Sequence, residues 1–217
     1  EVDVDLSTAA GRADAVAQVS ALAPDGLDGL ITCAGLSRAG APQVSVNYVG
    51  TVDLVLGLQP ALAASSAPRV AIVGSISATQ PHDAALVEAC LAGDEAAGLS
   101  RAQELVDGGR SHEIYSSTKA ALARWLRQVS VRKEYAGEGI AVNGIAPGVV
   151  LTPMTAELVS DPQWKAVMDR AVPMPLNGYA PPETIANALA WLIAPENSHM
   201  AGQMIFVDGG AEILTSR

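Results

Sequence analysis

Short apolar runs alternate with longer helical stretches along the whole chain, and this alternation constrains the fold more than any other feature. Runs with strand character cover residues 1–6, 27–35, 69–77, 139–148 and 202–210. Helices are expected over residues 7–24, 43–62, 112–135 and 182–194. Strands separated by helices pair in parallel, with the helices on the faces of the sheet. We therefore predict an α/β fold with a doubly wound parallel sheet, forming a single Rossmann-like domain over residues 1–217.

The composition limits the core and the partners of such a domain. Aromatic residues make up only 4% of the chain, so the core must consist of Ala, Val, Leu and Ile, as in buried parallel sheets. The formal net charge of −10 argues against nucleic acid and acidic membrane surfaces as partners. Two cysteines and scattered histidines form no metal-ligand pattern. No apolar run approaches the roughly 20 residues of a membrane span, so we expect a soluble cytoplasmic protein without a metal.

Residues that could bind a ligand or take part in catalysis lie where the predicted strands end. Asp5, Ala34 with Gly35, Ser75 to Ser77, and Pro147 with Gly148 all occupy such positions. In an open parallel sheet, ligands bind outside the carboxyl ends of the strands. Glycine and serine also end strands for purely structural reasons, so the positions alone leave both interpretations open.

Tyr115 and Lys119 form a second group of interest at the start of a predicted helix. They lie four residues apart and therefore project from the same helix face, with only small polar residues between them. Such a pair also occurs by chance on helix surfaces. Its occurrence together with the residues at the strand ends favours a functional role.

These motifs, in this order, resemble those of the short-chain dehydrogenase/reductase family. "TCAG" at 32–35 resembles the family's Asn-Asn-Ala-Gly, with Cys33 in place of an asparagine, and Asn47 matches the family's helix asparagine. Ser75 resembles the catalytic serine, and Tyr115-x-x-x-Lys119 the catalytic pair. "VNGIAPGVVLTPM" and "GQMIFVDGG" are similar to the family's later strands. Within the family, "DLSTAAGR", "LDGLITCAG" and "QVSVNY" are most like the 3α-hydroxysteroid dehydrogenase/carbonyl reductases.

The resemblance implies a set of catalytic roles. Tyr115 would be the general acid/base, Ser75 would hydrogen-bond the substrate oxygen, and Asn47 would anchor a water in a proton relay. Lys119 would hold the cofactor ribose and lower the pKa of the tyrosine. An ammonium at about 4 Å contributes roughly 4 kcal/mol at an effective dielectric constant of about 20, or about three pKa units. Ser77 is the alternative to Ser75.

The resemblance also implies a nicotinamide cofactor, NAD or NADP, with a slight preference for NAD. We expect Asp5 and Leu6 to contact the adenine. Ala34 and Gly35, with Cys33 beside them, would let the backbone approach the adenosine ribose. The residues expected near the nicotinamide end are Tyr115, Lys119, Pro147, Gly148, Val150 and Thr152.

The substrate loop, residues 153–178, is predominantly apolar. Met154 and Leu158 are the residues in it that we expect to contact the substrate. The alternative is that its apolar residues only pack the loop onto the domain. A mobile apolar loop suits a hydrophobic secondary alcohol or ketone, such as a steroid. We therefore expect an NAD(P)-dependent oxidoreductase that acts by hydride transfer.

Two features depart from the family pattern. The family's first strand-helix-strand, with its Gly-rich turn, is not found within residues 1–217, so the resemblance implies an N-terminally incomplete domain that belongs to a longer chain. If that segment is truly absent, the alternative is a non-catalytic binding or regulatory relative. A hydrolase that uses Ser75 is disfavoured, because no histidine is placed to complete a triad. The second departure is an insertion, residues 79–113, which should cover the outer face of the helix that carries Tyr115. A covered face cannot form an interface between subunits, so we expect a homodimer through the C-terminal region.

Overall fold

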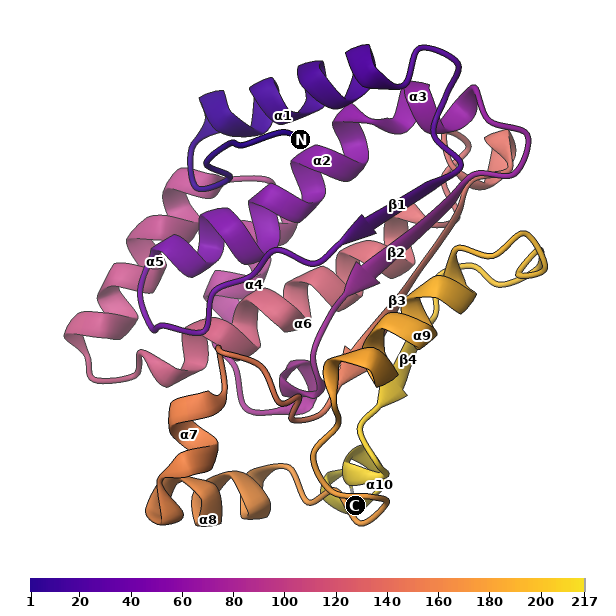
Figure 1. Ribbon diagram of the computed structural model, residues 1–217. Helices are drawn as coiled ribbons and strands as arrows, with labels where there is room; N and C mark the ends of the chain where they lie inside the picture. Colours follow the sequence, from indigo (N-terminus) through magenta and orange to yellow (C-terminus); the bar gives the residue numbers. More distant parts are fainter. Residues whose placement is uncertain (217) are drawn as a thin grey trace.

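A parallel sheet with helices on both faces forms the centre of the protein (Figure 1). The computed structural model describes residues 1–216, except for the side chain of Glu157. The four strands lie in the order β1-β2-β3-β4, and each neighbouring pair is parallel. Their bounds are β1 Gly29–Thr32, β2 Arg69–Val73, β3 Ala141–Pro147 and β4 Met204–Val207. The predicted α/β fold with a parallel sheet is therefore confirmed.

The strand predicted for residues 1–6 is absent, and that prediction is wrong. Within the described residues, β1 pairs only with β2, so no neighbouring strand offers hydrogen bonds to residues 1–6. A strand needs such a partner for its backbone groups. The chain turns instead at Asp5, whose carboxylate accepts from Ser7 N–H at 2.9 Å and whose carbonyl accepts from Thr8 N–H at 3.2 Å.

Most helices pack on one face of the sheet. Val70, Ile72 and Val142 point to this face and join a large core cluster with residues of the covering helices. Helix α1 (Ala9–Leu22) begins at Thr8, whose hydroxyl accepts from Gly11 N–H at 3.0 Å. The other elements before the insertion are η1 (Val44–Gly50, a π-helix), α2 (Thr51–Gly57), α3 (Gln59–Ala63) and η2 (Ile76–Thr79, a 3₁₀ turn).

The insertion consists mainly of two helices, α4 (Ala84–Leu91) and α5 (Glu95–Asp107). Leu86 and Val87 of α4 and Leu105 of α5 are fully buried, in the same cluster as residues of α6 (His112–Val129). Helix α6 ends at Val129, before the predicted end at residue 135, and a short 3₁₀ turn η3 (Ala136–Glu138) follows. The insertion thus adds a further layer over the helix that carries Tyr115 and Lys119.

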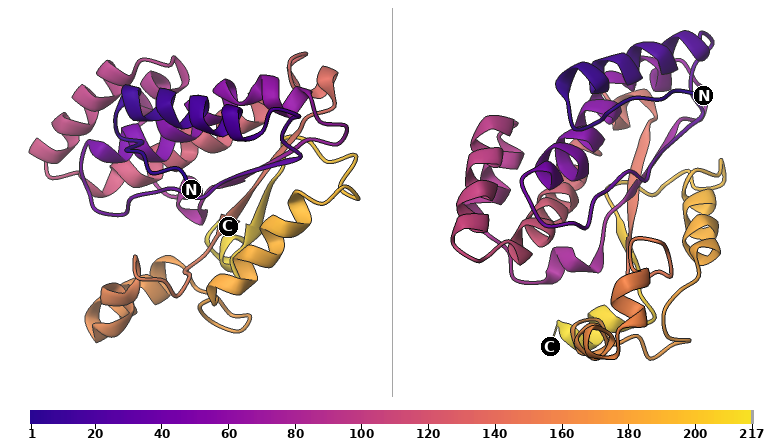
Figure 2. Two further views of the ribbon diagram at one scale, coloured as in Figure 1. Left: turned by 45° about the horizontal axis from the view of Figure 1, so that its top comes forward. Right: turned by 60° about the vertical axis from the view of Figure 1, so that its left-hand side comes forward.

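A single helix, α9 (Pro182–Leu192), covers the opposite face of the described sheet. Its Leu189 and Leu192 pack against Ala71 and Ile145, which alternate with the residues that face α6. The right-hand view of Figure 2 shows the sheet between α9 and the helices of residues 9–129.

The substrate loop forms two helices, α7 (Ala156–Ser160) and α8 (Pro162–Ala171), beyond the carboxyl ends of the strands (Figure 1). The last helix, α10 (Ala211–Thr215), supplies Ala211 to a small apolar cluster beneath this loop. Among the described residues, none of the helices combines the length and apolar character needed to cross a bilayer.

Candidate active site

A pocket of about 440 Å³ lies at the carboxyl ends of the strands. It brings together ten of the residues expected from the sequence, which come from the end of β3, the segments that follow β1, β2 and β3, and α6: Cys33, Gly35, Ser75, Tyr115, Lys119, Pro147, Gly148, Val150, Thr152 and Met154. Parallel strands deliver these residues to one edge because all their carboxyl ends point the same way. The pocket is therefore the candidate active site.

Lys119 is the buried cation of the pocket. Its side chain is almost fully enclosed, and its Nζ donates to the Val73 carbonyl at 2.9 Å and lies 5.7 Å from the centre of the Tyr115 ring. Burial lowers the pKa of Lys119 to about 8, and the interaction with Cys33 opposes this shift. Within the described residues, no carboxylate forms an ion pair with this ammonium. A buried cation without a counter-ion suits a ligand rich in oxygen atoms.

Tyr115 and Ser75 form the second part of the site. Burial raises the pKa of Tyr115, and a side-chain hydrogen bond with Ser75 opposes this shift. The protein's own residues therefore do not lower the pKa of Tyr115 as we expected, because desolvation of the phenol outweighs the other effects. Ser75 also begins the turn η2, since its Oγ accepts from Ser77 N–H at 3.1 Å. Ser77 does not line the pocket, which favours Ser75 over its alternative.

Asn47 lies outside the pocket, although it is fully buried. Its Oδ1 accepts from Leu36 N–H at 2.7 Å and its Nδ2 donates to the Leu36 carbonyl at 2.9 Å. The side chain therefore holds the segment that follows β1 and leads away from Gly35. Its role in a water relay stays a prediction.

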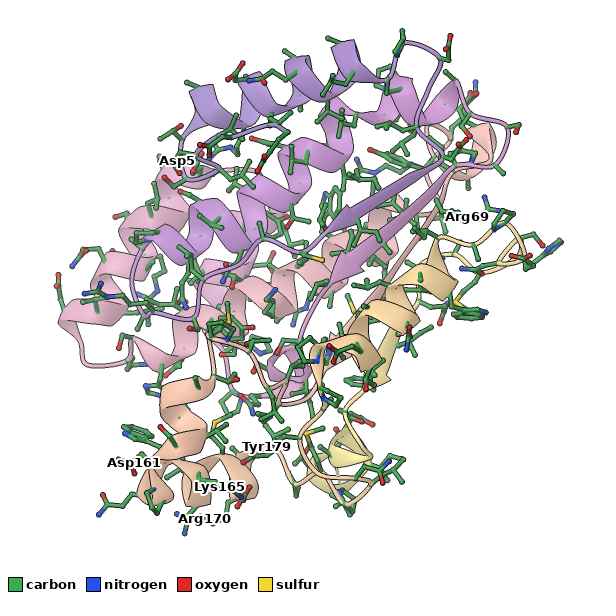
Figure 3. The ribbon with its side chains drawn as sticks, in the orientation of Figure 1. Asp5, Arg69, Asp161, Lys165, Arg170 and Tyr179 are labelled. Carbon is green, nitrogen blue, oxygen red and sulfur yellow. The ribbon has the colours of Figure 1, made fainter. Side chains whose placement is uncertain are left out.

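Four other expected residues do not line the pocket. Asp5 lies beside the start of α1 (Figure 3), and the Leu6 carbonyl accepts from Arg12 at 3.2 Å. Ala34 is exposed next to the pocket, and Leu158 lies on α7. Contacts of these four residues with adenine, ribose or substrate stay predictions.

The pocket also contains residues that the sequence did not reveal. Thr155 accepts from Thr152 N–H at 3.1 Å and donates to the Val150 carbonyl, so it fixes the turn that presents Thr152. Helix α9 contributes an apolar wall: Pro182, Ile185, Ala186 and Leu189. The spacing of Ile185 and Leu189 on one helix face was the available signal, but the sequence does not say which space that face borders.

The geometry fits a nicotinamide cofactor in chemical terms. A buried ammonium and two hydroxyl groups face a pocket whose remaining walls are mainly apolar, as a flat ring and its ribose require. A parallel α/β sheet with serine, tyrosine and lysine at this edge defines the protein as an oxidoreductase of the nicotinamide-dependent class. Across residues 1–216, no group of three or more His, Cys, Asp or Glu side chains could hold a metal ion.

Comparisons with known proteins identify the family. Residues 108–212 match the family model described as enoyl-(acyl carrier protein) reductase. The chain is 36% identical to the 3-alpha-hydroxysteroid dehydrogenase/carbonyl reductase of Comamonas testosteroni, over 99% of this chain and 84% of that protein. The protein belongs to the short-chain dehydrogenase/reductase family and is an NAD(P)-dependent alcohol dehydrogenase or carbonyl reductase.

Two solved structures extend this result. The 3-alpha-hydroxysteroid dehydrogenase from Pseudomonas sp. B-0831 complexed with NADH has a TM-score of 0.89 and 38% identity, over 99% of this chain and 85% of that chain. The Pseudomonas aeruginosa RhlG/NADP complex has a TM-score of 0.73 and 25% identity, over 96% of this chain and 75% of that chain. One of these similar structures therefore contains NADH and the other NADP.

Proposed function

We propose that the protein interconverts a hydrophobic secondary alcohol and the corresponding ketone, of the size and polarity of a steroid. The observation that carries this proposal is the meeting of Ser75, Tyr115 and Lys119 in one mainly apolar pocket. The similarity to two proteins named for 3-alpha-hydroxysteroids supports the substrate class. The alternative, a non-catalytic relative, gives no reason for a hydrogen-bonded serine and tyrosine beside a buried ammonium.

The residues of the pocket would act at the substrate oxygen. Tyr115 would donate a proton to the oxygen of a ketone during reduction and accept it back during oxidation. Ser75 would hold the same oxygen while its hydrogen bond orients the phenol. Lys119 would support the charge on Tyr115 when the proton leaves. Bound NAD(P) would supply or accept the hydride.

The cofactor would lie along the strand ends. Lys119 would hold its ribose, and Thr152, fixed by Thr155, would hold the carboxamide of the nicotinamide. Pro147, Gly148 and Val150 would flank the ring. We favour NAD over NADP, because the similar structure with the higher identity contains NADH.

The substrate would be covered by the substrate loop. Met154 lines the pocket, and Trp164 and Val167 of α8 expose 56% and 43% of their surfaces. An apolar side chain in the pocket wall and exposed apolar side chains on the substrate loop suit a hydrophobic substrate better than a sugar.

We also propose a cytoplasmic homodimer. Helices α4 and α5 cover α6, whereas Trp191 of α9 and Phe206 of β4 expose 51% and 38% of their surfaces. The exposed apolar side chains of the C-terminal region therefore favour this region as the contact between subunits.

A paired substitution tests the catalytic proposal. Tyr115→Phe in the full-length protein should lower the turnover of a hydrophobic ketone with NADH by at least about 100-fold, because only the transferable proton is lost. The dissociation constant of NADH, measured by fluorescence, should change less than about twofold. Tyr179→Phe is the matched control, since Tyr179 lies outside the pocket, beside Lys165 in the substrate loop (Figure 3). Near-normal turnover in Tyr115→Phe would end the assignment.

A further inference from the structure

Two serines that follow Tyr115 attach the catalytic helix to the segment that follows Ser75. Ser116 Oγ donates to the Pro81 carbonyl at 2.7 Å, and Ser117 Oγ accepts from Asp83 N–H at 2.9 Å. Both serine side chains are buried. The two halves of the site are therefore joined twice outside the pocket, through residues 81–83.

Asp83 is the point at which this connection meets the insertion. Its carboxylate is buried, with 6% of the side chain exposed. It caps α4 by accepting from Leu86 N–H at 2.9 Å, and it binds Arg101 of α5 through both oxygens, at 3.0 and 2.7 Å. Such paired hydrogen bonds between charged groups fix orientation as well as distance.

A second arginine extends the contact to the catalytic helix itself. Arg110 lies 3.4 Å from the Asp83 carboxylate and forms two hydrogen bonds, at 2.7 and 2.6 Å, with Glu113 in the first turn of α6. Asp83 thus contacts α4, α5, Arg110 just ahead of α6 and, through its backbone, Ser117. Hydrogen bonds from Arg101 and nearby positive charges hold the pKa of the Asp83 carboxyl at about 2, so the anion persists at any physiological pH.

We infer that Asp83 is a positioning residue for the reaction, which keeps the Ser75 hydroxyl and the Tyr115 phenol in hydrogen-bonding register by fixing residues 81–83 against Ser116 and Ser117. This inference rests on the proposed function, in which the two hydroxyl groups act on one substrate oxygen. Catalysis is sensitive to such placement, since a displacement of about 1 Å can cost about 100-fold in rate.

The test compares substitutions of the residues that cap the two helices of the insertion, Asp83 of α4 and Asp94 of α5. Asp83→Asn should lower kcat by about ten- to a hundredfold and leave the dissociation constant of NADH within about twofold. The control is Asp94→Asn, because Asp94 caps α5 through Ala97 N–H at 2.9 Å and, within the described part of the chain, forms no hydrogen bond or ion pair with α6. This variant should keep kcat within about twofold. In a Ser75→Ala background, Asp83→Asn should lower kcat by less than about twofold further, because the positioned hydroxyl is already gone.

Amide hydrogen exchange supplies a readout that does not depend on activity. Exchange over residues 76–79 and 115–119 should accelerate in Asp83→Asn but not in Asp94→Asn. If Asp83→Asn does not fold, Ser117→Ala removes the same connection with the ion pairs intact and should give the same pattern. Unchanged exchange in Asp83→Asn would overturn the inference. So would a decrease in kcat on adding Asp83→Asn to Ser75→Ala that is as large as the decrease in the wild type. A wild-type protein that reduces no ketone would instead refute the proposed function, while the exchange measurement would still decide the role of Asp83.

Discussion

Replacement of Lys119 by methionine should change the pH dependence of stability in a calculable way. Burial lowers the pKa of Lys119 from 10.5 to about 8. Below about pH 8 the folded protein bears the full cost of the buried charge, about 3 kcal/mol at about 1.36 kcal/mol per pKa unit. As the pH rises toward 10.5, the folded state has already lost this proton and the unfolded state follows, so the cost disappears. Lys119→Met lacks this contribution at every pH.

Urea unfolding of the full-length protein at several pH values measures the effect. The free energy of unfolding of the wild type, minus that of Lys119→Met, should rise by about 2.5 kcal/mol between about pH 7 and pH 10. At any single pH, the difference in the free energy of unfolding also includes the cost of leaving the Val73 carbonyl without its hydrogen-bond donor in Lys119→Met. That cost does not change with pH. Lys133→Met, at an exposed lysine, controls for the loss of one lysine from the chain. A difference that stays constant over this range would show that the ammonium is not desolvated in the folded protein.

Three further changes have distinct expected outcomes. Arg12→Met should lower the free energy of unfolding by about 2 kcal/mol in urea titrations, because the buried guanidinium bonds two partly exposed carboxylates, Glu95 among them at 2.6 Å. Thr155→Val should raise the dissociation constant of NADH about fivefold through the loss of about 1 kcal/mol in the Thr152 turn, and Thr155→Ser should restore it; equal losses in both variants would contradict the role of the hydroxyl. Light scattering should show a homodimer, and deletion of residues 83–109 should give larger assemblies, whereas a tetramer of the intact protein would refute the assignment of the interface.

The sequence correctly predicted the site residues whose positions follow from short-range rules of secondary structure. Ser75, Tyr115 and Lys119 meet because strand ends share one edge and a four-residue helical spacing shares one face, and both rules act within a few residues. The strand expected over residues 1–6 failed because strand formation depends on a neighbour that no local pattern reveals. Propensity alone does not provide hydrogen-bond partners.

Long-range environment explains the remaining differences. The pKa of Tyr115 depends on how much protein surrounds the phenol, and desolvation there outweighs the effect expected from a nearby lysine. The apolar wall from Ile185 and Leu189 depends on which side of the sheet α9 occupies. Neither quantity can be read from spacing in the chain.

The position of α9 has a consequence for chirality. The connections β1–β2 and β2–β3 place their helices on one face, and β3–β4 continues in the same direction but places α9 on the other face. Its hand is therefore opposite to that of the first two. Because about 98% of such crossovers are right-handed, we assign the right hand to β1–β2 and β2–β3 and the left hand to β3–β4. The right-handed twist of the strands, which favours the packing of a right-handed crossover onto the sheet, therefore does not favour the packing of α9 and β4. We expect this unit to assemble last during refolding, so that Trp191 fluorescence lags behind that of Trp125 in variants with a single tryptophan.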